Sequence, residues 1–333
     1  MRILTQAQVT SLLPMRECIP LMEAALASLS RGQVVLPLRP VLRIPDRHDV
    51  FAMMPAYSAA LPAFGVKLIT VFPSNHGTDL DSHQGAVLLF DSQHGQLVAM
   101  LDASSITAIR TAAVSAVATR LLAREDACTL ALLGSGVQAR THLEAIALVR
   151  PITTVRVWSR TRDHAAAFAA WAERAHGIAV EVADSAPRAV RRADVICTVT
   201  SSREPVLRGE WLEPGVHVNA VGASQPGARE LDSAAVATAR VFADRRESLL
   251  HESEDFLAPM REGLVSERSV VAELGEILTG KALGRTAPAE ITLFKSLGLA
   301  VEDLAAACHV YERAEREGVG TEVALGGRRP PSE

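Results

Sequence analysis

The stretch Leu130-Ala-Leu-Leu-Gly134-Ser-Gly136-Val-Gln-Ala139-Arg-Thr-His-Leu-Glu144 decides how this chain is expected to fold. An apolar run, typical of a buried strand, ends in Gly-x-Gly-x-x-Ala and continues into a sequence that favours a helix. Gly134 permits a tight turn, Gly136 lets the backbone approach a pyrophosphate, and Ala139 is small enough for close helix packing. The helix N-terminus would offer free N–H groups to phosphates. We therefore predict a dinucleotide site whose contacts come from the turn and the first helical residues, namely Gly134, Ser135, Gly136, Val137 and Gln138.

The chain after Ala127 alternates between strand-like and helix-like segments. A helix is expected at 163–176, and apolar runs typical of strands occur at 154–158, 178–182, 194–199, 216–221 and 240–243. This alternation predicts a parallel, doubly wound α/β sheet with right-handed crossovers, the Rossmann arrangement.

The preceding part of the chain has a different pattern. The insert Asp91-Ser-Gln-His-Gly95 is a turn signal between two strand-like runs. A helical repeat covers 16–31, and the strand-like runs lie at 34–38, 41–44, 50–54, 65–72, 86–91 and 97–102. We predict an α+β unit built mainly of antiparallel strands, followed by a long helix at 104–122. A final helix is expected at 301–317.

Composition argues against several classes of protein. The 333 residues carry a net charge of −4 and no long basic run, so nucleic-acid binding is not expected. Hydrophobic residues make up 48 % and aromatic residues only 4 %, which favours an aliphatic core of helices on a parallel sheet. The cysteines lack metal-site or disulfide spacing and indicate a reduced, cytoplasmic protein; they are Cys18, Cys128, Cys197 and Cys308. We expect no signal peptide, no membrane span and no metal site.

The residues after the second strand of the parallel sheet indicate which dinucleotide is bound. NAD-binding folds have an acidic residue there, which binds the ribose hydroxyls. This chain has Ser159, Arg160 and Thr161 instead. An arginine can pair with a phosphate dianion, and the two hydroxyls can donate hydrogen bonds to it. We therefore predict NADP(H) rather than NAD(H); the alternative is that Arg160 is only a solvated loop residue.

Several motifs together resemble those of the ornithine cyclodeaminase/mu-crystallin family. They are Met54-Pro-Ala-Tyr57, Gly65-Val-Lys67, Ser82-His83-Gln84-Gly-Ala-Val-Leu-Leu-Phe90, Ile106-Thr-Ala-Ile-Arg110-Thr111-Ala112-Ala113, Asn219-Ala-Val-Gly-Ala-Ser224-Gln-Pro, Glu273-Leu-Gly-Glu and Phe294-Lys-Ser-Leu-Gly298. The resemblance covers almost the whole chain, from about Leu4 to Val323. It implies a homodimer, a substrate-binding and dimerisation domain at 1–115 to which the last helix (about 300–323) returns, and an NADP-binding Rossmann domain at 116–299. Residues 324–333 are expected to form a disordered tail.

Three cations in the first domain form a candidate anion clamp. Arg39 is expected in a strand with Leu36 and Leu38, Lys67 within an apolar strand, and Arg110 in the first turns of an Ala-rich helix. Positive charges in apolar surroundings are costly unless an anion pairs with them. The alternative for each is a snorkelling side chain or a structural salt bridge. By resemblance, Arg39, Lys67 and Arg110 match the residues that bind the substrate carboxylate, and Lys67 could also relay a proton.

One position helps to choose an activity within the family. Ornithine cyclodeaminases have a catalytic aspartate where this chain has Ser224, and a serine cannot act as a carboxylate base. The ketimine reductases of the family resemble this chain at that loop and at 159–161. We therefore predict NADPH-dependent reduction of a cyclic imine beside a carboxylate, such as pyrroline-2-carboxylate or piperideine-2-carboxylate. The alternatives are ornithine cyclodeaminase, an alanine or other amino-acid dehydrogenase, and a non-catalytic NADPH-binding protein.

Other residues have weaker predicted roles. His83 or Ser224 is expected to contact the ring nitrogen. Thr111, Val221, Gly222 and Ser296 are expected near the cofactor, although Thr111 could instead satisfy a backbone group within its helix. Lys295 and Ser296 could line the nicotinamide pocket, or they could terminate a helix.

Overall fold

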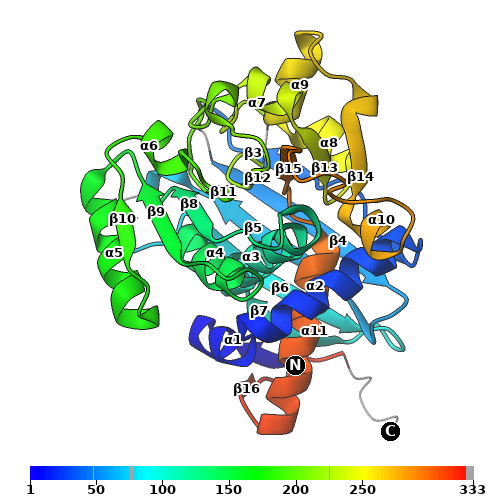
Figure 1. Ribbon diagram of the computed structural model, residues 1–333. Helices are drawn as coiled ribbons and strands as arrows, with labels where there is room; N and C mark the ends of the chain where they lie inside the picture. The colour runs from blue at the N-terminus through cyan, green and yellow to red at the C-terminus, as the bar shows by residue number, and fades with distance from the viewer. Residues whose placement is uncertain (48, 76–77, 225, 328–333) are drawn as a thin grey trace, which may run out of the picture. The chain divides into compact units, whose positions relative to one another are not determined.

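The computed structural model describes residues 1–47, 49–75, 78–224 and 226–327 (Figure 1). These residues divide into two compact units. Unit 1 comprises Met1–Leu21, Arg31–Arg110 and the chain from Leu299 onwards, whereas unit 2 comprises Met22–Ser30 and Thr111–Gly298. Most of the tail expected to be disordered, residues 328–333, lies outside the described residues.

Unit 2 contains an eight-stranded sheet in which all paired strands are parallel, so the predicted Rossmann arrangement is confirmed. The spatial order is β10-β9-β8-β11-β12-β15-β13-β14. The strands are β8 (Thr129–Leu133), β9 (Thr154–Trp158), β10 (Val180–Val182), β11 (Val195–Thr198), β12 (His217–Ala220), β13 (Arg240–Ala243), β14 (Val270–Glu273) and β15 (Thr292–Lys295). The order reverses between β8 and β11, which is where such sheets bind ligands.

Helices cover both faces of this sheet because its strands are apolar on both sides. Leu130 and Leu132 of β8 pack with α4 (Val137–Ala147) and α5 (Arg162–His176), while Ala131 and Leu133 pack on the opposite side. The second side is covered by α6 (Ala186–Val190), α7 (Ser233–Thr238), α8 (Arg246–Glu252) and α9 (Glu254–Arg261). The remaining short elements of unit 2 are α10 (Leu274–Leu278), η2 (Gly209–Trp211) and η3 (Glu267–Ser269).

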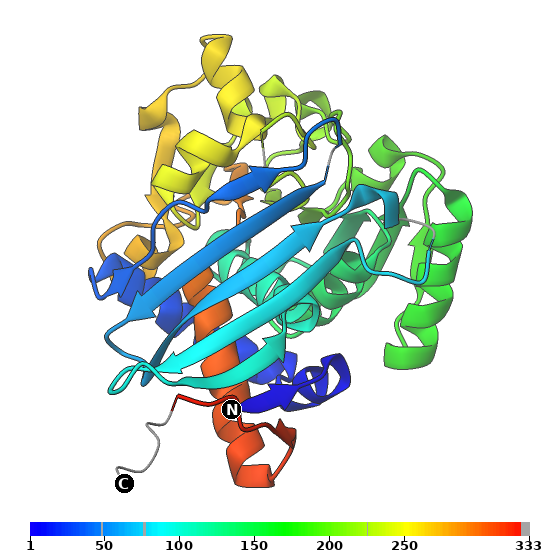
Figure 2. The ribbon, with the colours of Figure 1, turned by 180° about the vertical axis from the view of Figure 1, so that it is seen from behind.

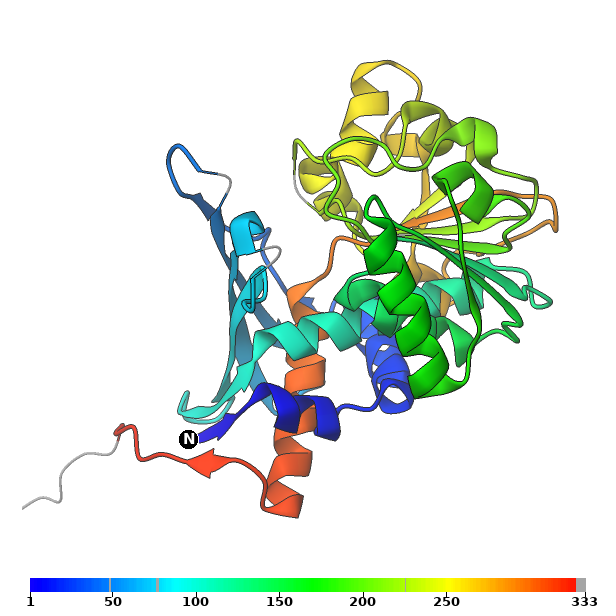
Figure 3. The same ribbon diagram turned by 90° about the vertical axis from the view of Figure 1, so that its left-hand side faces the viewer.

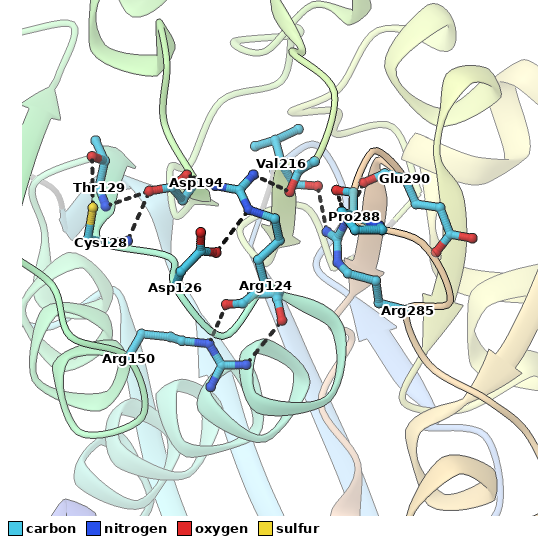
Figure 4. Close-up of polar contacts among 12 residues, drawn as sticks. Arg124, Asp126, Cys128, Thr129, Arg150, Asp194, Val216, Arg285, Pro288 and Glu290 are labelled. Atoms are coloured by element: carbon cyan, nitrogen blue, oxygen red, sulfur yellow. Dashed lines mark hydrogen bonds and ion pairs between the residues drawn. The ribbon is translucent and has the colours of Figure 1, made fainter.

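An ionic network fixes the amino ends of the central strands (Figure 4). Asp194, just before β11, accepts hydrogen bonds of 2.9 Å from the backbone N–H groups of Cys128 and Thr129 at the start of β8. Its other carboxylate oxygen pairs with Arg124, and the Arg150 guanidinium donates to the Arg124 carbonyl at 2.8 Å. This network lies at the amino ends of the strands, away from the carboxyl ends where such sheets bind ligands. We therefore infer that it stabilises the fold.

Unit 1 contains a second eight-stranded sheet, mainly antiparallel as predicted. The spatial order is β16-β1-β7-β6-β5-β4-β2, and β3 also pairs with β4. The strands are β1 (Arg2–Leu4), β2 (Val34–Val35), β3 (Val41–Arg43), β4 (Val50–Ser58), β5 (Ala63–Val71), β6 (His83–Asp91), β7 (Leu97–Asp102) and β16 (Thr321–Glu322). The predicted turn between β6 and β7 forms because the Asp91 carboxylate accepts bonds from three backbone amides of the turn, those of Gln93, His94 and Gln96.

Helix α11 (Ala300–Glu317) packs on one face of this sheet, against β4, β5 and β6 (Figures 2 and 3). The predicted return of the last helix to the first domain is thus confirmed. The other helical elements are α1 (Gln6–Leu12), α2 (Met15–Ser30), α3 (Ala103–Leu122) and η1 (Pro73–Asn75). Both α2 and α3 are continuous through the division between the units.

The structure differs from the sequence-based expectations in three local features. The strand expected at 34–38 ends at Val35, so Arg39 lies in irregular backbone before β3. Lys295 and Ser296 do not terminate a helix: Lys295 is the last residue of β15 and Ser296 follows it. Strands β1, β14, β15 and β16 were not anticipated, since three of them are short or lie at an edge and β15 ends in a lysine. Among the described residues, no helix is long and apolar enough to cross a membrane.

A buried histidine gives unit 2 a testable dependence on pH. His142 of α4 is 0 % exposed; its Nδ1 lies 2.7 Å from the Gln138 carbonyl and its Nε2 lies 2.9 Å from the Ser115 hydroxyl of α3. The carbonyl can only accept, so Nδ1 carries the proton and Nε2 accepts from Ser115. Burial lowers the pKa of His142 to about 4, and the ring is therefore neutral in the folded protein.

We predict that His142 makes the protein less stable as the pH falls below about 6.5, because the unfolded chain then binds a proton that the folded chain excludes. The stability from this residue is complete above that pH and declines by up to about 1.4 kcal/mol per pH unit towards pH 4. Urea unfolding at pH 8.0 and 5.5 should show a smaller loss for His142→Gln than for the wild type. His164→Gln, at an exposed histidine of α5, is the control. Equal losses in wild type and His142→Gln would contradict the prediction.

Candidate active site

Two buried cations of unit 1 meet two carboxylates from the first turn of α11. Lys67 Nζ of β5 lies 3.0 Å from Asp303 Oδ1 and 2.9 Å from Oδ2. Arg110 of α3 donates from Nε to Asp303 Oδ1 at 3.0 Å and from Nη1 to Glu302 Oε2 at 2.7 Å. We call Lys67, Arg110, Glu302 and Asp303 the ionic cluster. Lys67 is 2 % exposed and Arg110 is 4 % exposed. A buried cation without an anionic partner is strongly destabilising, so both cations depend on Glu302 and Asp303.

The local sequence explains why these side chains point inward. Strand β5 alternates, with 63, 65, 67 and 69 buried, and Lys67 therefore faces α11 with its apolar neighbours. Glu302 and Asp303 lie in the first turn of α11, where carboxylates are favoured by the helix dipole. The sequence interpretation missed both acidic residues, although two cations in apolar segments signalled that anions were needed.

Electrostatics in the ionic cluster poises Lys67 for proton exchange. Burial lowers the pKa of Lys67 to about 8, against the attraction of Asp303, and the charges of Arg110 and Arg39 lower it further. Burial alone would raise the pKa of Asp303, but the positive charges of Arg110 and Lys67 outweigh it and hold that pKa below its ordinary value. A lysine with a pKa of about 8 can donate a proton near neutral pH.

The ionic cluster is balanced in charge, and a third cation acts on it. Lys67 and Arg110 together match Glu302 and Asp303, so the ionic cluster sums to zero. Arg39, which is half-buried, lies close enough for its charge to act on Lys67. His83 is exposed at the start of β6, and its Nδ1 lies 3.0 Å from the Ser82 hydroxyl.

The turn between β8 and α4 in unit 2 has the form that a pyrophosphate needs. Gly134 has φ +119°, and a Cβ there would lie 2.6 Å from the Val199 carbonyl oxygen. Gly136 is exposed, and nothing lies within 4 Å of where its Cβ would be. Gly136 is also the N-cap of α4 and offers no side chain to bond the first N–H groups. These residues fit a bound diphosphate. Ser135 lies between the two glycines, and Val137 and Gln138 begin α4.

The other predicted cofactor residues of unit 2 lie at the carboxyl ends of its strands. Ser159, Arg160 and Thr161 follow β9, and Arg160 and Thr161 are exposed. On the other side of β8, Val221, Gly222 and the half-buried Ser224 follow β12, while the buried Ser296 follows β15 and donates its N–H to the Ala220 carbonyl at 3.0 Å. Thr111 is buried within α3. Apart from Thr111, the predicted residues thus follow the carboxyl ends of the strands, where such sheets bind ligands.

A second buried ionic group lies near these loops and was not predicted. Lys295 of β15 is 1 % exposed, and its Nζ lies 2.9 Å from Asp255 Oδ2 of α9. Asp255 Oδ1 accepts the backbone N–H groups of Glu230 and Leu231 at 2.8 and 2.9 Å. Glu230 is itself buried. In the part of the chain that the structure describes, no group of three or more His, Cys, Asp or Glu side chains could hold a metal ion.

Comparison with known proteins assigns the chain to a family. The family model for the ornithine cyclodeaminase/mu-crystallin family matches residues 1–318. The chain belongs to this family. It is 45 % identical over 298 residues to the ketimine reductase mu-crystallin of Mus musculus, covering 88 % of this chain and 91 % of the mouse protein. It is 40 % identical over 324 residues to a Delta(1)-pyrroline-2-carboxylate reductase of Bacillus cereus, covering 97 % and 99 %.

Solved structures of family members agree with the fold. The Thermococcus litoralis Delta(1)-pyrroline-2-carboxylate reductase, in complex with NADH and L-proline, is 38 % identical with a TM-score of 0.95 and covers 97 % of this chain and 100 % of its own. An archaeal alanine dehydrogenase dimer with bound NAD is 32 % identical with a TM-score of 0.92 and covers 98 % and 99 %. The family therefore includes proteins with different substrates on one fold.

We predict that Asp303 keeps the pKa of Lys67 from falling further. The chain has three lysines, Lys67, Lys281 and Lys295, so ¹³Cε resonances of labelled lysine can be assigned and titrated individually. Lys67 should titrate near pH 8 in the wild type and at a lower pH in Asp303→Asn, because the substitution removes the attraction that favours the charged amine. The exposed Lys281 provides an internal control. A Lys67 pKa that is unchanged or raised in Asp303→Asn would contradict the assignment.

Proposed function

We propose that this protein reduces cyclic ketimine carboxylates with NADPH, converting pyrroline-2-carboxylate to proline and piperideine-2-carboxylate to pipecolate. The observation that carries the proposal is the ionic cluster, which brings two buried cations, Lys67 and Arg110, together in unit 1, with Arg39 near enough for its charge to act on Lys67. The relatives that carry reductase names act on substrates of this class, and one was solved with L-proline.

The residues of this chain would bind and orient the substrate. The Arg110 guanidinium is held by two carboxylates, and a fork held in this way can orient a carboxylate. Lys67 would add a point charge and, with a pKa of about 8, a proton for the ring nitrogen. A bound nicotinamide nucleotide would supply the hydride that the C=N carbon accepts. The main contribution of the protein to rate is then orientation of the reacting carbon.

Ser224 separates this proposal from the cyclodeaminase alternative. It lies after β12 and is half-buried, and its hydroxyl can contact a ring nitrogen but cannot serve as a carboxylate base. An archaeal alanine dehydrogenase of similar structure, solved with NAD, supports the alanine dehydrogenase alternative. The same cations would hold the carboxylate of pyruvate. A non-catalytic NADPH-binding protein would bind nucleotide without turnover.

One assay series distinguishes these functions. The protein is incubated with NADPH and either cyclic imine, with NADPH, pyruvate and ammonium, and with ornithine in the absence of added reductant. We expect NADPH oxidation with the imines and a rate that is higher at pH 7 than at pH 9, because both the iminium and protonated Lys67 become less abundant as pH rises through 8. Turnover only with pyruvate and ammonium, or ammonia release from ornithine, would overturn the proposal. Tight NADPH binding with no turnover would favour the binding-protein alternative.

The proposed preference for NADPH rests on the loop after β9. Arg160 is exposed there, between Ser159 and Thr161, and no acidic residue occupies these positions. Two structural relatives were solved with NADH and with NAD, so the nucleotide preference of this chain is tested directly below.

We predict that Arg160→Asp shifts the ratio of kcat/KM for NADPH over NADH towards NADH by about tenfold or more, because the carboxylate repels the 2′-phosphate. Arg162→Asp is a matched control, since Arg162 is also exposed and pairs with Asp184. If Arg160→Asp leaves the ratio at the wild-type value, Arg160 does not bind the phosphate.

We further propose that the protein is a homodimer and that the outer face of the unit 1 sheet is the interface. This face points away from α11 and carries no charge at its central positions, which are Phe51, Met53, Pro55, Tyr57, Phe64, Val66, Leu68, Ala86, Leu88, Phe90 and Met100. Phe64 and Phe90 stack at 5.5 Å, and Met53, Tyr57 and Phe64 are 37–44 % exposed. Contiguous apolar surface of this kind is typical of an interface. Figure 2 shows this face.

We predict that Val66→Asp converts the dimer to a monomer. Val66 is paired with Pro55 and Leu88 at the centre of the outer face, and a dimer would bury an unpaired carboxylate there at a cost of several kcal/mol. Sedimentation velocity at micromolar concentration measures the change. Ser11→Asp, which adds the same charge at an exposed position of α1, should remain dimeric. A dimeric Val66→Asp protein would place the interface elsewhere.

A further inference from the structure

A single buried carboxylate joins the loops that follow two neighbouring strands of unit 2. Glu230 is 0 % exposed. Its Oε1 accepts the backbone N–H and the hydroxyl of Thr200, both at 2.6 Å. Its Oε2 accepts the Thr198 hydroxyl and the backbone N–H of Gly222, both at 2.7 Å. Thr198 ends β11, and Gly222 lies two residues after β12.

These contacts use both oxygens of Glu230 as acceptors. The two backbone N–H groups can only donate, one to each carboxylate oxygen, so each oxygen must offer a lone pair. Burial raises the pKa of Glu230 above its ordinary value, while the charge of Lys295 and the threonine hydroxyls oppose that rise. The backbone of Glu230 is also fixed, because Asp255 accepts its N–H and in turn pairs with Lys295.

The loop after β12 lies in close contact with the Thr200 loop and with Glu230. A Cβ on Gly222 would lie 2.1 Å from the Thr200 carbonyl oxygen and 2.6 Å from Glu230 Oε1. The Val221–Gly222 backbone therefore lies directly against the Thr200 loop, and the Glu230 carboxylate bonds to both. Val221 and Gly222 N–H groups also reach the Thr198 carbonyl, at 3.0 and 3.2 Å.

The position of these loops in the sheet indicates which part of a dinucleotide they serve. A dinucleotide lies across the point where strand order reverses, here between β8 and β11. The Gly134–Gly136 turn would hold the pyrophosphate at β8, and the β9 loop with Arg160 lies on the adenosine side. The loops after β11 and β12 lie on the other side of β8, where the nicotinamide half belongs.

We propose that Glu230 is a positioning residue that shapes the nicotinamide half of the nucleotide site through Thr198, Thr200 and Gly222, without contacting the nucleotide itself. This rests on the proposed nucleotide site of unit 2 and goes beyond it, because Glu230 is not part of the phosphate turn or of the β9 loop. Glu230 sets the affinity and environment of the nicotinamide ring and leaves the ADP-ribose half unaffected.

Binding measurements on the full chain test this without reference to catalysis. The probes are NADPH and NADH, and, as fragments without the nicotinamide, ADP-ribose and its 2′-phosphate, each titrated by calorimetry. Glu230→Gln keeps the shape of the side chain, but its NH₂ group must face one of the two backbone N–H donors. We expect NADPH and NADH to bind at least about tenfold more weakly to Glu230→Gln, while both fragments bind within about twofold of the wild type. The fluorescence of bound NADPH should also change in position or intensity.

Two further variants provide a control and an independent test. Glu204→Gln alters an exposed carboxylate of the segment after β11 and should match the wild type with every probe. Thr198→Val removes one hydroxyl donor and leaves the backbone in place; it should weaken NADPH binding in the same selective way and decides the matter if Glu230→Gln does not fold.

The outcomes separate two failures. A wild-type protein that binds neither NADPH nor NADH overturns the proposed nucleotide site, and this inference with it. A wild type that binds them, with variants that bind NADPH as tightly or that lose the fragments equally, overturns the role of Glu230 alone.

Discussion

The pairing of Lys67 and Arg110 with Glu302 and Asp303 is the interaction on which unit 1 depends. A buried cation without a partner is strongly destabilising, so a strand and a helix that carry such cations need a third element that brings carboxylates to the same depth. Helix α11 does so from 236 residues further along the chain than Lys67. Residues near the end of the chain therefore stabilise a strand and a helix near its beginning, and we propose that the same charges bind a small anion.

Unit 2 also pairs a buried cation with a carboxylate from another element of the fold. Lys295 ends a buried strand, Asp255 of a neighbouring helix neutralises it, and Asp255 also holds the backbone of Glu230. These charges lie towards the carboxyl ends of the strands, where the nucleotide residues were predicted. At the amino ends, Asp194 and Arg124 form a network whose partners are the chain's own backbone amides and carbonyls. The ionic groups at the amino ends of the strands therefore stabilise the chain's own backbone, whereas those towards the carboxyl ends lie near the residues predicted to bind the nucleotide.

The sequence predicted what depends on local pattern. Strand β9 was predicted with its observed bounds and β8 with its following turn and helix, because apolar runs and glycine spacing are short-range signals. The turn after β6 was predicted from Asp91 and Gly95. Strand β15 was missed because Phe294 is followed by a lysine, and nothing near Lys295 in the sequence shows that Asp255 will neutralise it. Glu302 and Asp303 were missed because acidic residues at a helix start are common and their partners lie about 190 and 236 residues away.

The division of the chain into units has a consequence for experiments on its parts. Unit 1 is assembled from three separate segments and unit 2 from two, with the chain passing between them within α2, after Ser30, within α3 and before Leu299. Trimming either terminus therefore cannot isolate one unit intact, and a single protease nick cannot release one as a free peptide. Deletions from either end first remove residues of unit 1, and swapping substrate or nucleotide modules between relatives requires grafts at several junctions.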